Sequence, residues 1–296
     1  MPRQFHNQPE KSHQHRFLVD LWKDVPLDVS VHAQNGGVGG SDPKVLEMLA
    51  AGELEFATMM GPIIARLVPA AEIQGVPFAF HNPQQAHAAM DGALGEHLRS
   101  ECLSRGLYLV PGGALENGLR QICSAKRAVR SPEDLAGYRM RVPAGRIYAE
   151  LFTALGATPV TVNIDGLRAA LEQGAVDGHE NPLVIVEVNG LHGVSKHISV
   201  TNHAWSGFNL VANLDYWRSL SGHVQDAIHR SAKKHVARQR EYAVALNLAL
   251  QKQLPVEHVA QAPFRERIGP ELYASWKERC GTIAWRLLRE AGARLD

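Results

Sequence analysis

The segment of this 296-residue chain that is most informative about its architecture is Asp165-Gly-Leu-Arg-Ala-Ala-Leu-Glu-Gln-Gly-Ala-Val-Asp-Gly-His-Glu-Asn-Pro182. Its first part predicts a helix with apolar residues on one face, and Gly174 is a typical residue to end it. Ala175-Val176 then predicts a short buried strand, and the Asp-Gly and Asn-Pro pairs that follow are typical of turns. A helix, a terminating glycine and a buried strand in succession indicate α/β architecture.

The same unit occurs once more, in the first half of the chain. Asp42-Pro-Lys-Val-Leu-Glu-Met-Leu-Ala-Ala-Gly52 leads into an apolar strand at Leu54–Met59, so the sequence predicts two similar α/β lobes. Residues 223–254 contain no glycine or proline, which predicts one long helix. At 1.5 Å per residue a helix of about 30 residues would be ~45 Å long, enough to brace both lobes.

Composition excludes several classes of protein. Lys and Arg number 31 against 30 Asp and Glu, for a net charge of +1, which gives no electrostatic case for nucleic acid or for an anionic membrane surface. No apolar run is long enough to span a membrane. The three cysteines have no metal-ligand spacing, so neither zinc nor a disulfide framework is predicted, although one disulfide beside a free thiol remains open. We expect no cofactor and no catalytic metal.

Three side chains could recognise a ligand. Arg141 lies in a predicted strand just before Pro143, and ligands of open α/β sheets bind at the ends of strands. A guanidinium there can hold a carboxylate through two parallel hydrogen bonds. Arg120 lies in another predicted strand, and Asn181 precedes Pro182, where its amide could point into a cleft. Each has a simpler alternative, a surface arginine or an ordinary turn.

The stretch Gly174-Ala-Val-Asp-Gly-His-Glu-Asn-Pro182 closely resembles the pattern G-x-V-D-G-x-E-N-P of the solute-binding proteins of TRAP transporters (DctP type). Leu135–Pro143 is similar to the family's L-x-G-x-x-h-R-V-P strand, in which h is apolar, and Leu155–Val160 to its L-G-A-x-P-V. The resemblance implies a two-lobed, periplasmic-binding-protein-like (Venus-flytrap) architecture whose long helix bridges both lobes. Residues 1–118 and 206–245 would form lobe I, and residues 119–205 and 246–296 lobe II.

The resemblance also implies the ligand-binding residues. Arg141 matches the arginine that clamps a carboxylate, Arg120 a frequent second arginine, and Asn181 the pocket asparagine. Met60 lies where sugar-acid binders carry a glutamate, which favours a less hydroxylated, more apolar ligand. Four further residues are predicted to reach the cleft, with a purely structural role as the alternative for Trp205 and His6: Ile164, Trp205, His6 and Asn7.

The implied function is binding without catalysis, by closure of two lobes around a small organic acid. A monocarboxylate, hydroxy acid or aromatic acid is preferred, and a C4-dicarboxylate remains open because Arg120 could serve a second carboxylate. The implied partners are the membrane subunits of a TRAP transporter, and the protein is expected to be a monomer. A metal ion beside the carboxylate is another open alternative.

Two other functions remain possible from the sequence. One is a sensory protein with the same pocket, and the other is an α/β enzyme acting on a carboxylic acid, against which the lack of a G-x-S-x-G motif counts. The N-terminus shows no signal peptide, which alone would favour the cytoplasm. The resemblance implies the periplasm instead, with the signal peptide removed or the start misannotated.

Overall fold

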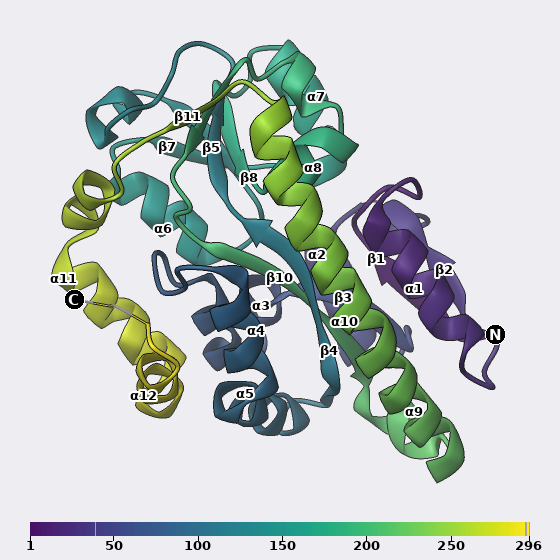
Figure 1. Cartoon of the computed structure of the whole chain (residues 1–296). Helices are drawn as coiled ribbons and strands as arrows, with labels where there is room; N and C mark the ends of the chain where they lie inside the picture. Colours follow the sequence, from purple (N-terminus) through teal and green to yellow (C-terminus); the bar gives the residue numbers. More distant parts are fainter. Residues whose placement is uncertain (39, 294, 296) are drawn as a thin grey trace.

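Two β-sheets organise the chain, each flanked by helices (Figure 1). The computed structural model describes residues 1–38, 40–293 and 295. In the first sheet the strand order is β2-β1-β3-β10-β4, with β1 parallel to β2 and β3 and β10 antiparallel to both its neighbours. Its strands are β1 (Arg3–His6), β2 (Ser30–His32), β3 (Phe56–Met60), β4 (Leu107–Leu119) and β10 (Trp205–Asn213).

The second sheet has the order β11-β9-β5-β8-β6-β7. Strands β8, β6 and β7 run parallel, and β5 lies antiparallel between β8 and β9. Its strands are β5 (Gln121–Ser124), β6 (Arg139–Val142), β7 (Thr158–Thr161), β8 (Gly178–Asn181), β9 (His197–Val200) and β11 (Val256–His258).

Helices connect the strands and cover the sheets. The α-helices are α1 (His13–Lys23), α2 (Asp42–Ala50), α3 (Gly61–Ile64), α4 (Pro83–Asp91), α5 (Ala93–Leu103), α6 (Arg146–Ala154), α7 (Ile164–Glu172), α8 (Leu183–Val188), α9 (Leu214–Ser219), α10 (Gly222–Gln253), α11 (Ala262–Cys280) and α12 (Thr282–Glu290). Short 3₁₀ turns are η1 (Ala33–Asn35), η2 (Pro69–Gly75), η3 (Pro132–Leu135) and η4 (Leu191–Gly193). No helix of the described residues is both long and apolar enough to cross a membrane.

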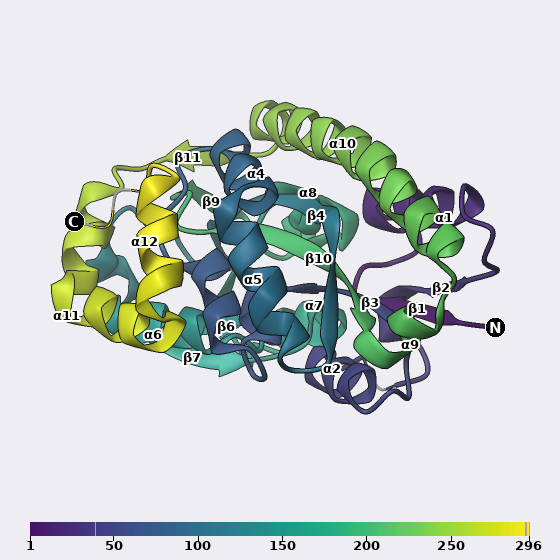
Figure 2. The same ribbon diagram turned by 90° about the horizontal axis from the view of Figure 1, so that it is seen from below.

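The two sheets are joined by a few chain segments. Strand β4 continues into β5 across Arg120, and β9 turns back into β10 across residues 201–204. Helix α10 forms the third link (Figure 2): Ile228 packs in the core beside the first sheet, and Leu250 packs in the core beside the second. The prediction of two lobes braced by one long helix is therefore confirmed.

The C-terminal helices pack on elements from both sides. Helix α12 contacts α5 and η2, and α11 contacts η2 and α6. Arg279 of α11 forms ion pairs with Glu72 of η2 and, at 2.6 Å, with Glu150 of α6. The predicted residue boundaries of the two lobes stay a prediction.

Two sequence expectations were wrong in detail. The strand expected at Ala175-Val176 begins at Gly178 instead, so the polar segment interpreted as a turn forms β8, between β5 and β6. The sequence of residues 270–291 also predicts one closing helix, but this helix is interrupted, because Gly281 between α11 and α12 has a φ of +89° that ends the first helix. Gly269, with a φ of +74°, also breaks α11 internally.

Candidate ligand-binding site

A small cavity of ≈ 20 Å³ lies between the two sheets. Its walls come from the residues that end β1, β3, β6 and β8, from the starts of α2 and α7, and from β4, β10 and α8. This is where α/β sheets bind ligands, because the carboxyl ends of parallel strands leave a crevice there. Its lining residues are Asn7, Gln8, Asp42, Met60, Asn117, Arg120, Arg141, Pro143, Ile164, Asn181, Ile185 and Phe208.

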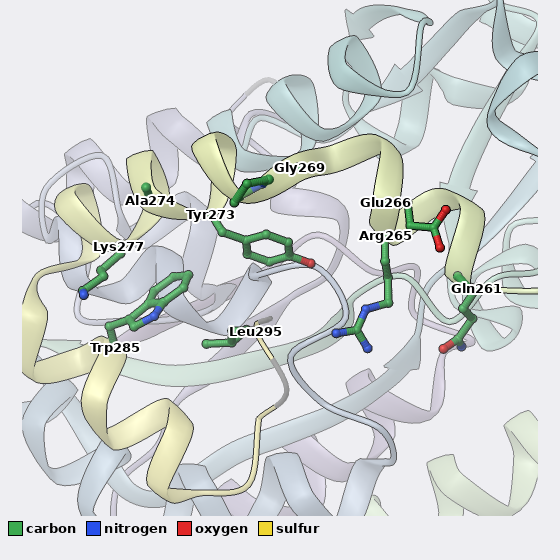
Figure 3. Close-up of a pocket in the computed structure, with 11 residues that line it drawn as sticks. Gln261, Arg265, Glu266, Gly269, Tyr273, Ala274, Lys277, Trp285 and Leu295 are labelled. Carbon is green, nitrogen blue, oxygen red and sulfur yellow. The ribbon is translucent and has the colours of Figure 1, made fainter.

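A larger hollow of ≈ 720 Å³ lies elsewhere, along the break in α11 (Figure 3). Its walls are formed by α11, by Trp285 of α12 and by Leu295, with no contribution from either sheet. The volume of a cavity therefore does not identify the ligand-binding site in this protein. The small cavity is the stronger candidate because buried charged and polar side chains from both sheets converge on it.

Arg141 is the most informative residue of the cavity. Its side chain is 2% exposed, and its Nε donates to the carbonyl oxygen of Val162 at 2.7 Å. Its Nη1 has no hydrogen-bond partner, and the guanidinium forms no ion pair with any described carboxylate. Burial lowers the pKa of Arg141 to about 10, against the raising influence of nearby Glu180. A buried charge without a partner is strongly unfavourable, so this site favours an added anion.

Arg120 is buried as well, but it has an internal partner. Its Nε and Nη2 both donate to the Glu180 carboxylate, the latter at 2.7 Å, and its Nη1 donates to Ser206 Oγ at 3.1 Å. Burial alone would raise the pKa of Glu180, but Arg120 and His203 lower it to about 2. The His203 Nε2 atom lies 3.2 Å from that carboxylate. Arg120 is therefore neutralised within the protein, whereas Arg141 is not.

Six of the eight residues predicted for ligand binding line this cavity. They come from segments far apart in the sequence, and they are Asn7, Met60, Arg120, Arg141, Ile164 and Asn181. This convergence is a geometric finding, and contact of each with a ligand stays a prediction.

His6 lies outside this cavity. Its ring is fully buried, with Nε2 2.9 Å from His15 Nδ1. Burial, reinforced by the neighbouring His15, lowers the pKa of His6 to about 3. The neutral ring is thus held by contacts within the protein, and contact of His6 with a ligand stays a prediction.

Trp205 also lies outside the cavity. Its indole nitrogen donates to Glu116 Oε2 at 2.9 Å, and its ring meets Phe80 edge-on. Successive side chains of a strand point to opposite faces. Since Ser206 bonds to Arg120, the Trp205 side chain faces the first-sheet core instead.

Several cavity residues were missed by the sequence interpretation. Asp42, the first residue of α2, lines the cavity, whereas the helix is capped by Ser41 before it. Glu180 does not line the cavity but pairs with its residue Arg120; its place inside the recognised family motif was the signal available for it. The other missed lining residues are Gln8, Asn117, Pro143, Ile185 and Phe208.

The described part of the chain contains neither a cluster of metal ligands nor a disulfide bond. No group of three His, Cys, Asp or Glu side chains there is arranged to hold a metal ion. The three cysteines are unpaired and buried.

Comparison with known proteins identifies the family of this chain. Residues 6–279 match the sequence model of the bacterial extracellular solute-binding protein, family 7 (DctP). The chain is 28% identical over 231 residues to the C4-dicarboxylate-binding periplasmic protein DctP of Rhodobacter capsulatus, covering 76% of this chain and 66% of that protein. It is 31% identical over 213 residues to the uncharacterized protein y4mM of Sinorhizobium fredii, covering 72% of this chain but only 39% of that protein.

Solved structures agree on the fold. A TRAP periplasmic solute-binding protein of Xanthobacter autotrophicus with bound β-D-galacturonate superimposes with a TM-score of 0.91 at 20% identity, covering 99% of this chain and 100% of that one. The sugar acid binding protein DctPAm of Advenella mimigardefordensis, in complex with galactonate, gives 0.90 at 24% identity, covering 98% and 97%. The chain therefore belongs to the bacterial extracellular solute-binding proteins of family 7, which are receptors for solutes rather than enzymes.

Proposed function

We propose that this protein binds a small organic acid with one carboxylate in the periplasm and presents it to the membrane subunits of a TRAP transporter. The observation that carries the proposal is the buried Arg141 guanidinium without a carboxylate partner. A ligand carboxylate on this side chain would supply the missing charge through charge-assisted hydrogen bonds. The relatives named with galacturonate and galactonate also bind acids.

The balance of charge favours one carboxylate on the ligand. Arg120 is already paired with Glu180, so a second carboxylate near Arg120 would meet the negative charge of that glutamate. The apolar side chains of Met60, Ile164 and Phe208 line the same cavity. A monocarboxylate, hydroxy acid or aromatic acid therefore fits this lining better than a C4-dicarboxylate.

Ligand entry requires the lobes to separate. A cavity of ≈ 20 Å³ is about the size that one water molecule needs. Asn7 and Met60 lie at the ends of first-sheet strands, and Arg141 and Asn181 at the ends of second-sheet strands. We therefore propose a hinge at the crossings near Arg120 and residues 201–204, with closure on the acid as the signal that the membrane subunits read.

Thermal shift with a panel of acids tests this function. At 100 times Kd a ligand that binds only the native state adds about 2.7 kcal/mol of stability, which raises Tm by roughly 5–10 °C for a domain of this size. We expect Arg141→Gln to lose this shift. Arg139→Gln is the matched control, because Arg139 lies two residues earlier on the same strand but is exposed and pairs with Asp177.

Two results would contradict the proposal. One is a panel of mono- and dicarboxylates in which no acid stabilises the protein. The other is an Arg141→Gln variant whose Tm responds to the same acid as fully as the Arg139→Gln control does.

A further inference from the structure

The hollow along the break in α11 has the volume of a small-molecule site. Its ≈ 720 Å³ falls within the usual range of roughly 300–1,000 Å³ for such sites. The break itself creates the hollow, because Gly269, with a φ of +74°, divides α11 into two segments. The hollow and the cavity between the sheets share no described lining residue, so they are separate sites.

The lining of the hollow combines aromatic surface with positive charge. Tyr273 and Trp285 contribute their rings and are 7% and 6% exposed. Arg265 and Lys277 lie at opposite ends of the row of labelled side chains in Figure 3, and the described lining contains one acidic residue, Glu266. Rings that offer a flat apolar surface, together with an excess of cations, favour a ligand with an aromatic body and one anionic group.

The wall of the hollow is hydrogen-bonded to a segment beside the proposed hinge. Tyr273 Oη donates to the carbonyl oxygen of Pro77 at 3.1 Å. Burial raises the pKa of Tyr273 to about 12, so the hydroxyl keeps the proton that it donates at neutral pH. The backbone N–H of Phe78 donates to the carbonyl oxygen of His203 at 2.8 Å. One peptide group, between Pro77 and Phe78, is therefore held by α11 on its oxygen and by the crossing 201–204 on its nitrogen.

The backbone on both sides of this link has an unusual conformation. Phe78 has a φ of +57°, and Asn202, next to His203, has a φ of +46°. A left-handed conformation is unfavourable for a bulky side chain and persists only where the surrounding structure holds it. Tyr273 supplies one of the bonds that hold it, so a displacement of Tyr273 acts directly on the segment that contacts the hinge.

The contacts continue from the hinge to the ligand-binding cavity. His203 Nε2 lies 3.2 Å from the Glu180 carboxylate, which in turn accepts from Arg120 in the cavity wall. Helix α11 also contacts both sides of the molecule, η2 on one side and α6 and η3 on the other. The hollow is therefore connected to the elements that would move when the lobes separate.

We propose that the hollow along α11 is a second binding site, for a small molecule with an aromatic body and one anionic group, and that its occupant stabilises the closed arrangement of the lobes. The site itself is independent of the proposed function, whereas the coupling rests on the hinge proposed there. An occupant packed on the Tyr273 ring keeps the hydroxyl on Pro77, as in the closed arrangement described above. Because coupling is reciprocal, the occupant and the acid at Arg141 each raise the affinity of the other by the same factor.

Fluorescence titration with anilinonaphthalene sulfonate (ANS), an aromatic anion, tests the site. Ala274→Trp places a ring in the hollow and should raise the Kd of ANS at least roughly tenfold, because an overfilled site is costly. Ser275→Trp is the matched control, since Ser275 is the next residue of α11, exposed and outside the lining, and its Kd should not change. Lys277→Gln should weaken ANS by up to roughly fivefold, the range of an exposed ion pair, and leave the neutral analogue phenylnaphthylamine unaffected.

Two measurements test the coupling. Calorimetry with the most stabilising acid of the thermal-shift panel should give a Kd at least roughly fivefold lower in saturating ANS. Small-angle scattering of the acid-free protein should show that ANS lowers the radius of gyration. Tyr273→Phe keeps the ring in the hollow but removes the hydroxyl that reaches Pro77, so it should still bind ANS and lose both effects.

The outcomes separate this inference from the proposed function. If Ala274→Trp binds ANS as tightly as Ser275→Trp, or if ANS weakens acid binding by competing at Arg141, the second site is wrong. If ANS binds in the hollow but both effects are absent, or are equally large in Tyr273→Phe, the coupling is wrong. If no acid binds, the proposed function is wrong, while the ANS titrations and the scattering still decide the inference.

Discussion

Replacing Arg141 by methionine is expected to close the unliganded cleft. Burial lowers the pKa of this guanidinium from 12.5 to about 10. A difference of about 2.5 pKa units corresponds to about 3 kcal/mol of penalty on the charged form. In the proposed open form water would solvate the group, so up to this amount would favour opening when no acid is bound. Arg141→Met removes the charge and keeps most of the side-chain volume, so the closed-to-open ratio should rise by up to roughly 100-fold.

The assay is fluorescence energy transfer across the cleft. Lys44 of α2 and Glu172 of α7 are exposed and lie on opposite sides, so cysteines introduced there can carry the dyes. The native thiols are buried, and burial raises the pKa of Cys102 and Cys280 to about 12, which protects them from labelling. Single-molecule histograms of the unliganded protein then report the two populations directly.

Arg141→Met should shift the unliganded population toward high transfer and abolish any further shift with acid. Arg139→Met, on the same strand but paired with Asp177, should leave the histogram unchanged. If the unliganded Arg141→Met variant is as open as the unmodified protein, the unpaired charge does not hold the cleft open. A shift toward lower transfer would contradict the reasoning more directly.

Three further predictions concern stability and reactivity. Glu180→Gln should lower the free energy of unfolding by roughly 3 kcal/mol at pH 7, because it leaves Arg120 buried and unpaired. Since the folded pKa of Glu180 is lowered from 4.5 to about 2, its contribution to the free energy of unfolding is present above pH 4.5 and lost as pH falls toward 2. Urea titrations between these pH values should therefore show that the variant loses less stability on acidification than the unmodified protein. The same dependence of stability on pH in both proteins would contradict this. Arg279→Gln should lower the free energy of unfolding by about 3 kcal/mol, because Glu72 is buried and loses its cationic partner. A change in the urea midpoint that corresponds to under 1 kcal/mol would contradict a stabilising role of the Arg279–Glu72 ion pair. No thiol should react with a disulfide reagent in the native protein, and all three cysteines should react in denaturant; rapid reaction of the folded protein would show a less protected core.

Local patterns were enough to predict the helix at 223–254 and the strand that carries Arg141. Both follow from short-range rules, since helix breakers are absent from the first and Pro143 follows the second. Arg120 and Asn181 were candidates from their local sequence and again from the motif resemblance, and the structure brings both to the cavity. For these residues, the neighbouring sequence was enough to indicate that they lie at the ligand-binding cavity.

The rest depends on partners distant in the sequence. Strand β8 is polar and yet buried, because Glu180 finds its cation 60 residues away at Arg120. No local pattern distinguishes such a strand from a solvated turn. The orientation of the Trp205 side chain could have been predicted. Once the strand is known to begin at Trp205, the alternation of side chains along β10 and the position of Phe208 show which face Trp205 occupies. The role of Asp42 depends on its contacts with Asn7 and Asn35, which lie on separate segments.

The place of β10 in the first sheet has a consequence for the order in which the chain folds. This strand lies between β3 and β4, but it follows them in the sequence, and residues 120–204 separate β4 from β10. Until β10 has paired, β3 and β4 have unpaired edges, which are open to association with other chains. The first sheet therefore cannot be completed from the first half of the chain alone, so the two lobes mature together rather than one after the other.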